Sequence, residues 1–337
     1  MKYPVLQTEN RVFRTYRGGK QLDSMLQKQV PKDSFQPEDW ISSFVEAKNK
    51  NYIPGEGISK VLIDGKAVDI TQVITPKDLG PGRTESGVLV KFLDAAERLG
   101  IQVHPTPAFS RKHFGTNYGK TECWHILNAD PEKDAAVYIG FKEGITREKF
   151  AKMYFEQDVA GMLDALHRFS VAPGDTVLVT AGTPHAIGAG CFLLEIQEPS
   201  DYTMRVETTT VAGEKLTRMQ ISYGLSDDAL LDCFDYTGLS RQAARQKYFL
   251  QGRPGAENEV QLVTYENTPC FALSRTTGKS LLRQDCFSTV VAMKPGKLVF
   301  AGQELAMQTG DKAFVPYGCQ QVLVDCEDAI ICYPPKV

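Results

Sequence analysis

The sequence predicts a mainly β protein with a few added helices, organised as two domains. Most apolar segments are short and are separated by Gly and Pro, as is typical of strands. Only two longer segments have the three-to-four-residue apolar spacing of helices. A short internal repeat indicates that one strand pair occurs twice. At 337 residues the chain is long enough for two domains with separate cores.

The first 60 residues are expected to be largely irregular, with a loop at 17–20. The first convincing strand begins at Glu38, and Trp40 on that strand is assigned to the core. An Asp-Gly pair suits a two-residue hairpin turn, so we expect a hairpin around Asp64-Gly65. A further strand is expected at 88–94, directly before the candidate site.

Two helical segments are expected to interrupt the strands. The first runs from Thr146 to Phe169 and begins with Thr146 as the N-cap. The second runs from Ser226 to Leu250 and is expected to break at Thr237-Gly238. Their Met and aromatic residues are assigned to ordinary core faces. From residue 258 onward short β-rich runs resume.

The internal repeat aligns residues 173–185 with 309–321 without gaps. Each copy reads as a Gly-Asp turn, an apolar strand, a second turn and another strand. His185 of the first copy corresponds to Gln321 of the second, and all five His of the chain precede residue 186. We therefore predict a catalytic domain at 1–250 that carries the helical insertions, and a smaller domain at 251–337 without a metal site.

Four polar residues form the candidate metal site. Gln102 and His104 are two residues apart, which places both side chains on one face of a strand. Glu122 begins the next strand-like segment, and His185 closes the first copy of the repeat. Two imidazoles, an amide oxygen and a carboxylate suit a divalent metal. We therefore predict that Gln102, His104, Glu122 and His185 bind one.

Such a site indicates Lewis-acid chemistry. With Glu122 as the only anionic ligand, a divalent ion keeps a net positive charge, and zinc does no redox chemistry. Aldose–ketose isomerisation needs that charge, because removing a proton next to a carbonyl builds negative charge on two oxygens. Lys120 and Glu195 are both candidates for moving the proton. Glu195 is alternatively a buried structural carboxylate paired with Arg205.

Composition excludes several other classes of function. The formal net charge of −3 is spread evenly, which favours neither a nucleic-acid surface nor a basic membrane face. The first residues lack the apolar core of a signal peptide, and no apolar run approaches the ~20 residues of a membrane span. The eight Cys include no C-x-x-C pair. We expect a reduced, cytoplasmic protein, monomeric or homodimeric, whose partner is a small molecule.

Four motifs resemble the type I mannose-6-phosphate isomerases, most closely the short bacterial form. They occur in order at 89–95, 101–105, 119–124 and 182–188. The resemblance implies two cupin (jelly-roll) β-barrel domains, one zinc ion per chain, and interconversion of mannose 6-phosphate and fructose 6-phosphate. It maps the zinc ligands onto the four residues of the candidate metal site.

The resemblance also extends beyond the metal ligands. Glu195, Asp201 and Arg205 keep the order of a family pattern that follows the last His. This implies that Arg205 and Lys120 contact the substrate, with Asp201 beside them. Lys91 is a further substrate-binding candidate, and a salt-bridged lysine is the alternative.

Three departures from the family pattern leave the sugar open. The early Gly-Gly motif reads Tyr16-Arg17-Gly18-Gly19 and lacks the usual Trp. Gly100 stands where Ser is common, and 206–209 is not the usual continuation after Arg205. The alternatives are an isomerase of a different sugar or sugar phosphate, and a sugar-phosphate-binding protein that keeps the metal without catalysis. No role is expected for His113 or His167. His125 is structural or supports a metal ligand.

Overall fold

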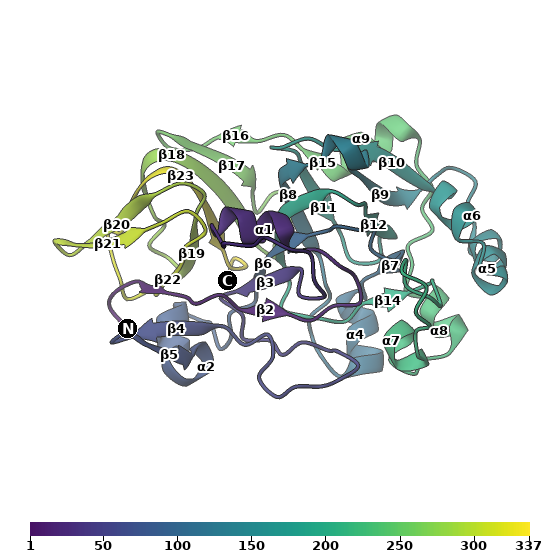
Figure 1. Ribbon diagram of the computed structural model, residues 1–337, viewed down its shortest axis with the longest axis horizontal. Helices are drawn as coiled ribbons and strands as arrows, with labels where there is room; N and C mark the ends of the chain where they lie inside the picture. Colours follow the sequence, from purple (N-terminus) through teal and green to yellow (C-terminus); the bar gives the residue numbers. More distant parts are fainter.

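The computed structural model describes all 337 residues and is built mainly from antiparallel sheets with short helices at their edges (Figure 1). Every strand ladder is antiparallel. Three sheets, of seven, five and two strands, come from the first 250 residues, and the nine-stranded sheet comes mostly from the remainder. No helix is long and apolar enough to cross a membrane.

The seven-stranded sheet forms the middle of the molecule. Its central strands are continuous apolar runs, because both of its faces are covered. The strand predicted at 88–94 is confirmed at Leu89–Asp94. The members of this sheet are β2 (Arg11–Val12), β3 (Glu38–Ile41), β6 (Leu89–Asp94), β8 (Glu122–Ala129), β11 (Thr176–Val179), β13 (Cys191–Gln197) and β15 (Phe249–Leu250).

The five-stranded sheet packs against one face of the seven-stranded sheet. Nineteen buried residues, including Trp124 and Ile139, fill the space between the two. A second core separates the outer face of this sheet from the helices on the right of Figure 1. The strands are β7 (Gln102–Val103), β9 (Ala136–Phe141), β10 (Leu166–Ser170), β12 (His185–Ile187) and β14 (Met204–Arg205).

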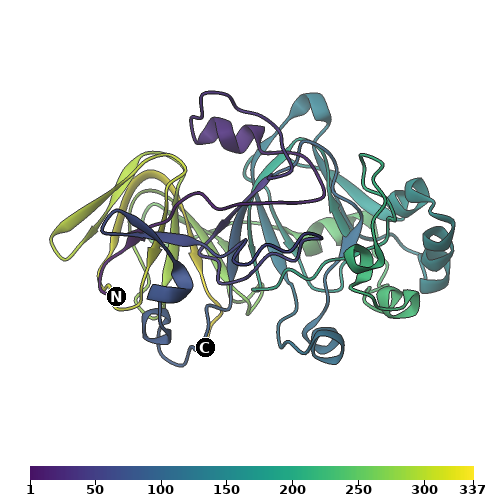
Figure 2. The same ribbon diagram turned by 60° about the horizontal axis from the view of Figure 1, so that its bottom comes forward.

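The nine-stranded sheet holds the end of the chain and lies at the left in Figure 1. It surrounds its own core of 17 buried residues. β1 also joins this sheet by pairing with β22. The N-terminal segment therefore lies beside the C-terminal strands, as Figure 2 shows. The strands are β1 (Val5–Leu6), β16 (Arg253–Pro254), β17 (Glu259–Val263), β18 (Ala272–Leu281), β19 (Ser288–Ala292), β20 (Gly296–Phe300), β21 (Gln303–Met307), β22 (Lys312–Val315) and β23 (Leu323–Tyr333).

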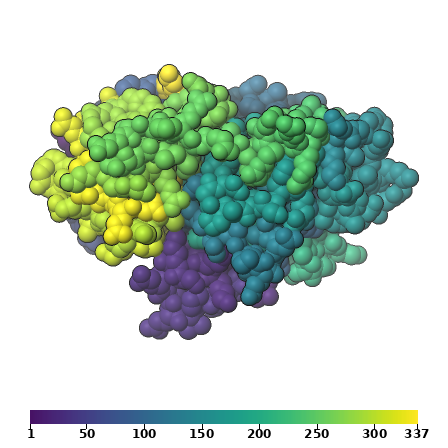
Figure 3. Space-filling view, turned by 90° about the horizontal axis from the view of Figure 1, so that it is seen from above, coloured from purple at the N-terminus to yellow at the C-terminus, as the bar shows by residue number.

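The largest core cluster joins the two halves of the chain. Its 24 buried residues include Phe92 and Leu194 of the seven-stranded sheet and Leu273 and Ile330 of the nine-stranded sheet. Figure 3 shows the two parts in broad contact, with the purple N-terminal segment projecting beside them. The strand alternation explains this layering, since Trp124 faces the five-stranded sheet and its neighbour Cys123 faces the other way.

Two of the sequence predictions for local structure are confirmed. β4 (Lys60–Ile63) and β5 (Lys66–Asp69) form the hairpin around Asp64-Gly65, whose residues have φ of 49° and 75°. The repeat is also real, because β11 and β22 begin at equivalent positions after Gly174 and Gly310.

The long helix predicted from Thr146 to Phe169 is wrong in its second half. Thr146 does cap α5 (Arg147–Glu156), but Gln157 at φ 53° ends that helix and α6 (Val159–Asp164) follows. Residues 166–170 form β10 instead, because pairing with β9 outweighs the helical pattern. His167 therefore lies on a strand.

The second predicted helix, 226–250, is also shorter than expected. Only α8 (Asp227–Leu231) and α9 (Arg241–Tyr248) are helical, and the break covers the nine residues between them. Phe249 and Leu250 pair with β11. The remaining helices are α1 (Lys20–Met25), α2 (Ile70–Val73), α3 (Pro76–Leu79), α4 (Pro107–Phe114), α7 (Arg218–Ser222) and the 3₁₀ turn Pro131–Lys133.

Candidate active site

The predicted metal-site residues come together where the five- and seven-stranded sheets meet. His104 follows β7, Glu122 is the first residue of β8, and His185 is the first residue of β12. One ligand atom of each lies within 4.8 Å of the others, and all three side chains are almost completely buried. Three ligands separated by up to 81 residues in sequence therefore form one possible metal site.

Gln102 completes the group. It pairs directly with His185 across β7 and β12, and its side-chain amide lies 3.2 Å from His185 Nε2. The amide oxygen and nitrogen have nearly the same shape, and a half-turn of the amide directs the oxygen toward the centre of the group. β7 contains only Gln102 and Val103, and His104 lies just beyond it.

Backbone carbonyls orient both imidazoles. His104 Nδ1 lies 3.0 Å from the Tyr202 carbonyl oxygen, and His185 Nδ1 lies 2.8 Å from that of Thr183. A carbonyl oxygen can only accept, so each Nδ1 carries the proton and each Nε2 keeps a free lone pair. Both Nε2 atoms face Glu122, at 3.1 and 3.4 Å from its carboxylate oxygens. This is the arrangement of imidazole ligands supported by backbone acceptors.

The donor set fits a divalent cation. Glu122 Oε1 accepts a hydrogen bond from Trp124 Nε1, but the buried Oε2 accepts none. The Lys120 ammonium lies 2.9 Å from His104 Nε2 and 3.0 Å from Glu122 Oε2, so the same two atoms already stabilise a positive charge. A buried anionic oxygen with unused lone pairs beside two neutral imidazoles is what a cation such as zinc requires.

The protonation states agree with this assignment. Burial, with the nearby charge of Lys120, lowers the pKa of His104 to about 3, and burial also lowers the pKa of His185. Burial alone would raise the pKa of Glu122, but Lys120 and the two imidazoles hold it well below its usual value. At neutral pH the site therefore contains two neutral imidazoles and one carboxylate.

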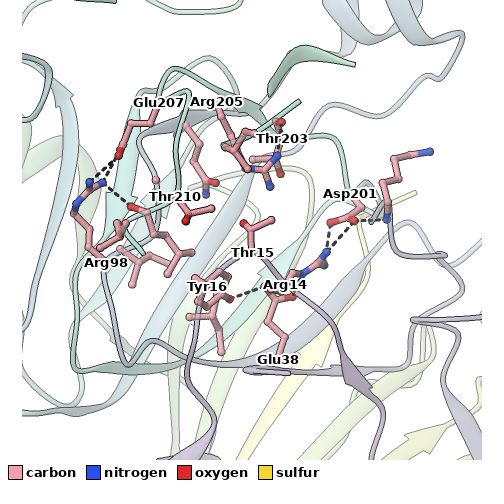
Figure 4. Close-up of a pocket in the computed structure, with 18 of the residues that line it drawn as sticks. Arg14, Thr15, Tyr16, Glu38, Arg98, Asp201, Thr203, Arg205, Glu207 and Thr210 are labelled. Carbon is pink, nitrogen blue, oxygen red and sulfur yellow. Dashed lines mark hydrogen bonds and ion pairs between the residues drawn. The ribbon is translucent and has the colours of Figure 1, made fainter. Parts of the chain in front are cut away.

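A cavity of about 800 Å³, counting the space open to solvent, lies beside this group, and Figure 4 shows residues that line it. Gln102 and Lys120 line the cavity, whereas the other metal-site residues lie behind them and do not line it. Its walls carry six cationic side chains and four carboxylates, which suits an anionic ligand rich in hydroxyls. The charged lining residues are Arg14, Glu38, Lys48, Lys91, Arg98, Lys120, Glu195, Asp201, Arg205 and Glu207.

Glu195 is the carboxylate best placed to accept a proton in this cavity. It is buried on β13, and its Oε1 makes no hydrogen bond although Lys91 Nζ lies 3.3 Å away. Burial raises the pKa of Glu195, and the positive charge of Lys91 opposes that rise. The alternative pairing of Glu195 with Arg205 is wrong, because the neighbouring cation is Lys91.

Arg205 and Asp201 both line the cavity, but they do not pair with each other. Arg205 Nη1 donates to the carbonyl oxygens of Gln220 and Thr203, at 2.6 and 3.4 Å, and forms no ion pair with a carboxylate. Asp201 accepts two hydrogen bonds from Arg14, at 3.1 and 3.2 Å. Arg205 is therefore free to bind a ligand anion, whereas Asp201 is already neutralised.

Sequence reasoning missed an important part of the site, the early segment that contains Arg14 and Glu38. The Glu38 carboxylate accepts hydrogen bonds from Tyr16 Oη and Trp40 Nε1 and lies 2.9 Å from Arg14 Nε. Lys91 Nζ lies 3.8 Å from the same carboxylate, so Lys91 is a salt-bridged lysine within the cavity wall. The available signal was that Glu38 is a charged residue on a short strand predicted to be buried through Trp40.

The remaining His residues lie outside the site. His125 points to the opposite face of β8 from Glu122, where its ring nitrogens lie 3.0 Å from Thr176 Oγ1 and 3.2 Å from Arg275 Nη1. The suggestion that His125 supports a metal ligand is therefore wrong. His167 contacts the Leu239 carbonyl, and the His113 ring packs at a tilt against Phe109.

Comparisons with known proteins are consistent with this geometry. The probable mannose-6-phosphate isomerase GmuF of Bacillus subtilis is 38% identical over 143 residues, which cover 42% of this chain and 44% of the relative. The mannose-6-phosphate isomerase of Streptococcus mutans is 39% identical over 128 residues, or 37% of this chain and 38% of the relative. The chain thus matches less than half the length of these curated relatives. A search of protein-family models found no match.

Solved structures match along almost the whole chain. The mannose 6-phosphate isomerase of Bacillus subtilis superposes with a TM-score of 0.77 at 20% identity, covering 98% of this chain and all of that one. A putative mannosephosphate isomerase from Archaeoglobus fulgidus gives 0.74 at 19% identity, covering 100% and 99%. The fold is therefore shared throughout. In its matched segments this chain is similar to bacterial mannose-6-phosphate isomerases, and it shares their fold over almost its whole length.

Proposed function

We propose that this protein is a zinc-dependent isomerase that interconverts mannose 6-phosphate and fructose 6-phosphate. The observation that carries this proposal is the convergence of Gln102, His104, Glu122 and His185 beside a cavity with an excess of cations. The named activity of the relatives supports the choice of substrate. Nitrogen and oxygen ligands of this kind favour zinc among the common metals.

We also propose that the sheets form two cupin-type barrels, divided near residue 250. The enclosed core between the seven- and five-stranded sheets supports the first, and the core inside the nine-stranded sheet supports the second. The possible metal group lies entirely in the first. Eight unpaired cysteines support a reducing location such as the cytoplasm.

In the proposed reaction, a bound zinc ion supplies Lewis-acid stabilisation of the negative charge that develops on the two substrate oxygens. Glu195 removes the proton from C2 of the aldose and returns it to C1, while the hydroxyl proton on O2 passes to O1, so no proton is gained or lost overall. Lys91 holds the Glu195 carboxylate in place, and Arg205 stabilises the anionic intermediate. Lys120 is the alternative proton carrier, although its ammonium already contacts His104 and Glu122.

The test is a coupled assay of mannose 6-phosphate turnover, run before and after treatment with a chelator. We expect turnover that is lost on chelation and restored by zinc. His104→Ala and His185→Ala should lower both metal content and turnover, whereas the control His113→Ala, on α4, should change neither. Metal-loaded protein that is inert on this sugar but active on another would indicate a different substrate. Binding without any turnover would indicate the non-catalytic alternative.

A further inference from the structure

One end of the cavity is formed by a paired arginine and carboxylate that the proposed reaction does not use. Arg98 Nη1 donates to Glu207 Oε1 at 2.7 Å, and Arg98 Nη2 donates to Glu207 Oε2 at 2.8 Å. This bidentate geometry holds a guanidinium group more firmly than a single hydrogen bond does. Figure 4 shows the pair at the opposite end of the cavity from Arg14 and Asp201, with Thr210 beside it.

Glu207 is held by more than Arg98. Its Oε1 also accepts a hydrogen bond of 2.7 Å from the Ile101 backbone N–H, one residue before Gln102. The side chain is 5% exposed, whereas that of Arg98 is 17% exposed. Glu207 is therefore a fixed, buried anchor, and Arg98 is the member of the pair that reaches the cavity.

Arg98 keeps unused hydrogen-bond donors. Its Nη1 is satisfied by Glu207 and by the Leu99 carbonyl, and one N–H of Nη2 is used by Glu207. The Nε–H and the second N–H of Nη2 donate to no protein acceptor, and neither nitrogen is a buried unsatisfied atom. Two such donors on one planar cation suit the oxygens of a phosphate group.

The position of Arg98 also fits the length of the proposed substrate. The Leu99 N–H donates to the Ile187 carbonyl at 2.9 Å, and Ile187 lies two residues along β12 from His185. Two residues of a strand span roughly 7 Å. A six-carbon sugar that reacts at its first two carbons near the metal ligands has its sixth carbon at the far end, toward Arg98.

Two departures from the family pattern meet at this place. A Cβ on Gly100 would be in van der Waals contact with Glu207 Oε1, at 3.8 Å, and Glu207 itself belongs to the unusual 206–209 segment. We propose that Arg98, oriented by Glu207, is a specificity-determining residue that binds the phosphate at the end of the substrate remote from the metal ligands. This inference rests on the proposed function. Arg98 would make the site prefer a phosphorylated sugar to the same sugar without phosphate.

The experiment measures binding separately from catalysis. Isothermal titration calorimetry on metal-loaded protein uses glucitol 6-phosphate, a reduced sugar phosphate that cannot be isomerised. Arg98→Gln should raise its dissociation constant about ten- to hundredfold, as expected for loss of a charge-assisted pair of hydrogen bonds. In the coupled assay the same variant should raise KM for mannose 6-phosphate and leave kcat within about threefold.

Glu207→Gln separates ligand binding from a merely structural role. This variant keeps an oxygen for the Ile101 N–H but loses the second acceptor that orients Arg98, so its affinity for glucitol 6-phosphate should fall between those of the wild type and Arg98→Gln. If the Arg98–Glu207 pair only holds β7 against β14, Arg98→Gln and Glu207→Gln will weaken binding equally and will lower the melting temperature by similar amounts. That result would overturn the inference.

Two further variants guard against a folding artefact. Arg98→Lys keeps the charge without the planar fork and should fall between the wild type and Arg98→Gln. The control Arg147→Gln removes a comparable arginine–carboxylate pair between α5 and α8 and should leave binding unchanged. Wild-type protein that does not bind glucitol 6-phosphate would overturn this inference, whereas turnover in the coupled assay decides the proposed function on its own.

Discussion

At the scale of single residues, the candidate site shows which functional groups can be found from residue type. The four metal-site residues were predicted because imidazole, amide and carboxylate are uncommon together in apolar segments, and the structure brings them into one group. Arg14 and Glu38 were not predicted, because their role depends on contacts with Asp201 and Lys91 far along the chain. Such contacts leave no local pattern.

The first prediction concerns the proton carrier. Glu195→Gln should lower kcat by about 10²- to 10⁴-fold, because the amide cannot accept a proton from carbon. Metal content, measured by elemental analysis, should stay at the wild-type level, since Glu195 is not among the proposed ligands. If Lys120→Ala loses turnover to this extent while Glu195→Gln keeps it, Lys120 is the carrier instead.

The pH profile provides a second prediction. Glu195 must be ionised to act, and burial raises its pKa while Lys91 opposes the rise. The value of kcat/KM should therefore fall as pH decreases through a pKa above that of an ordinary glutamate. Lys91→Met removes the opposing charge, so the acid limb of the profile should move to higher pH. A limb that stays in place or moves to lower pH would contradict the role of this pair.

At the scale of elements, the predictions failed where tertiary contacts replace local signals. α1 begins at a glycine without a capping side chain, and its first N–H groups are bound by Asp94 of β6, which is 72 or more residues away. β7, β12 and β14 contain only two or three residues each, too few for any periodicity. Residues 166–170, predicted to be helical, form β10 because they pair with β9. In each case a partner distant in sequence determines the element.

Gly18 gives a prediction at this scale. The loop that leads into α1 passes so close to β6 that a Cβ on Gly18 would lie 1.8 Å from the Asp94 carbonyl oxygen. Gly18→Ala should therefore lower the free energy of unfolding by about 1–3 kcal/mol, measured by urea denaturation. Turnover should fall as well, because the same loop positions Arg14 and Tyr16.

The matched control for that variant is Gly65→Ala in the β4–β5 turn. Gly65 has φ 75° and no atom within 4 Å of its would-be Cβ, so only backbone strain of about 1 kcal/mol is expected. Equal destabilisation by the two variants would show that the contact with Asp94 is not the reason for glycine at position 18.

At the scale of the whole molecule, the mainly β class was predictable because strand patterns dominate the sequence. The joint between the two halves, meaning the core cluster shared by the seven- and nine-stranded sheets, was not predictable from the sequence. The core cluster shared by the seven- and nine-stranded sheets draws residues from positions 5 to 332, and Arg275 of β18 reaches His125 of β8 across the same joint. Besides the core of each part, a third cluster therefore spans the boundary predicted near residue 250.

This joint predicts how the chain responds to division. Residues 1–250 produced alone should lack a cooperative thermal transition, because Phe92 and Leu194 would lose the apolar partners that cover them. Circular dichroism and gel filtration provide the measurement. A control with a protease site in the exposed segment 255–258, cut after folding, should keep its transition because every contact remains. A sharp transition in the 1–250 fragment near the full-length temperature would show that the joint is dispensable.

β1 also determines when this protein can finish folding. Val5 and Leu6 pair with Phe314 and Ala313 of β22, so this pairing cannot form until about 300 further residues have been translated. Contacts of such long sequence separation form slowly. Until translation passes residue 315, the β1 segment stays available to chaperones, which makes the nascent chain, rather than the finished protein, the stage most open to misassembly.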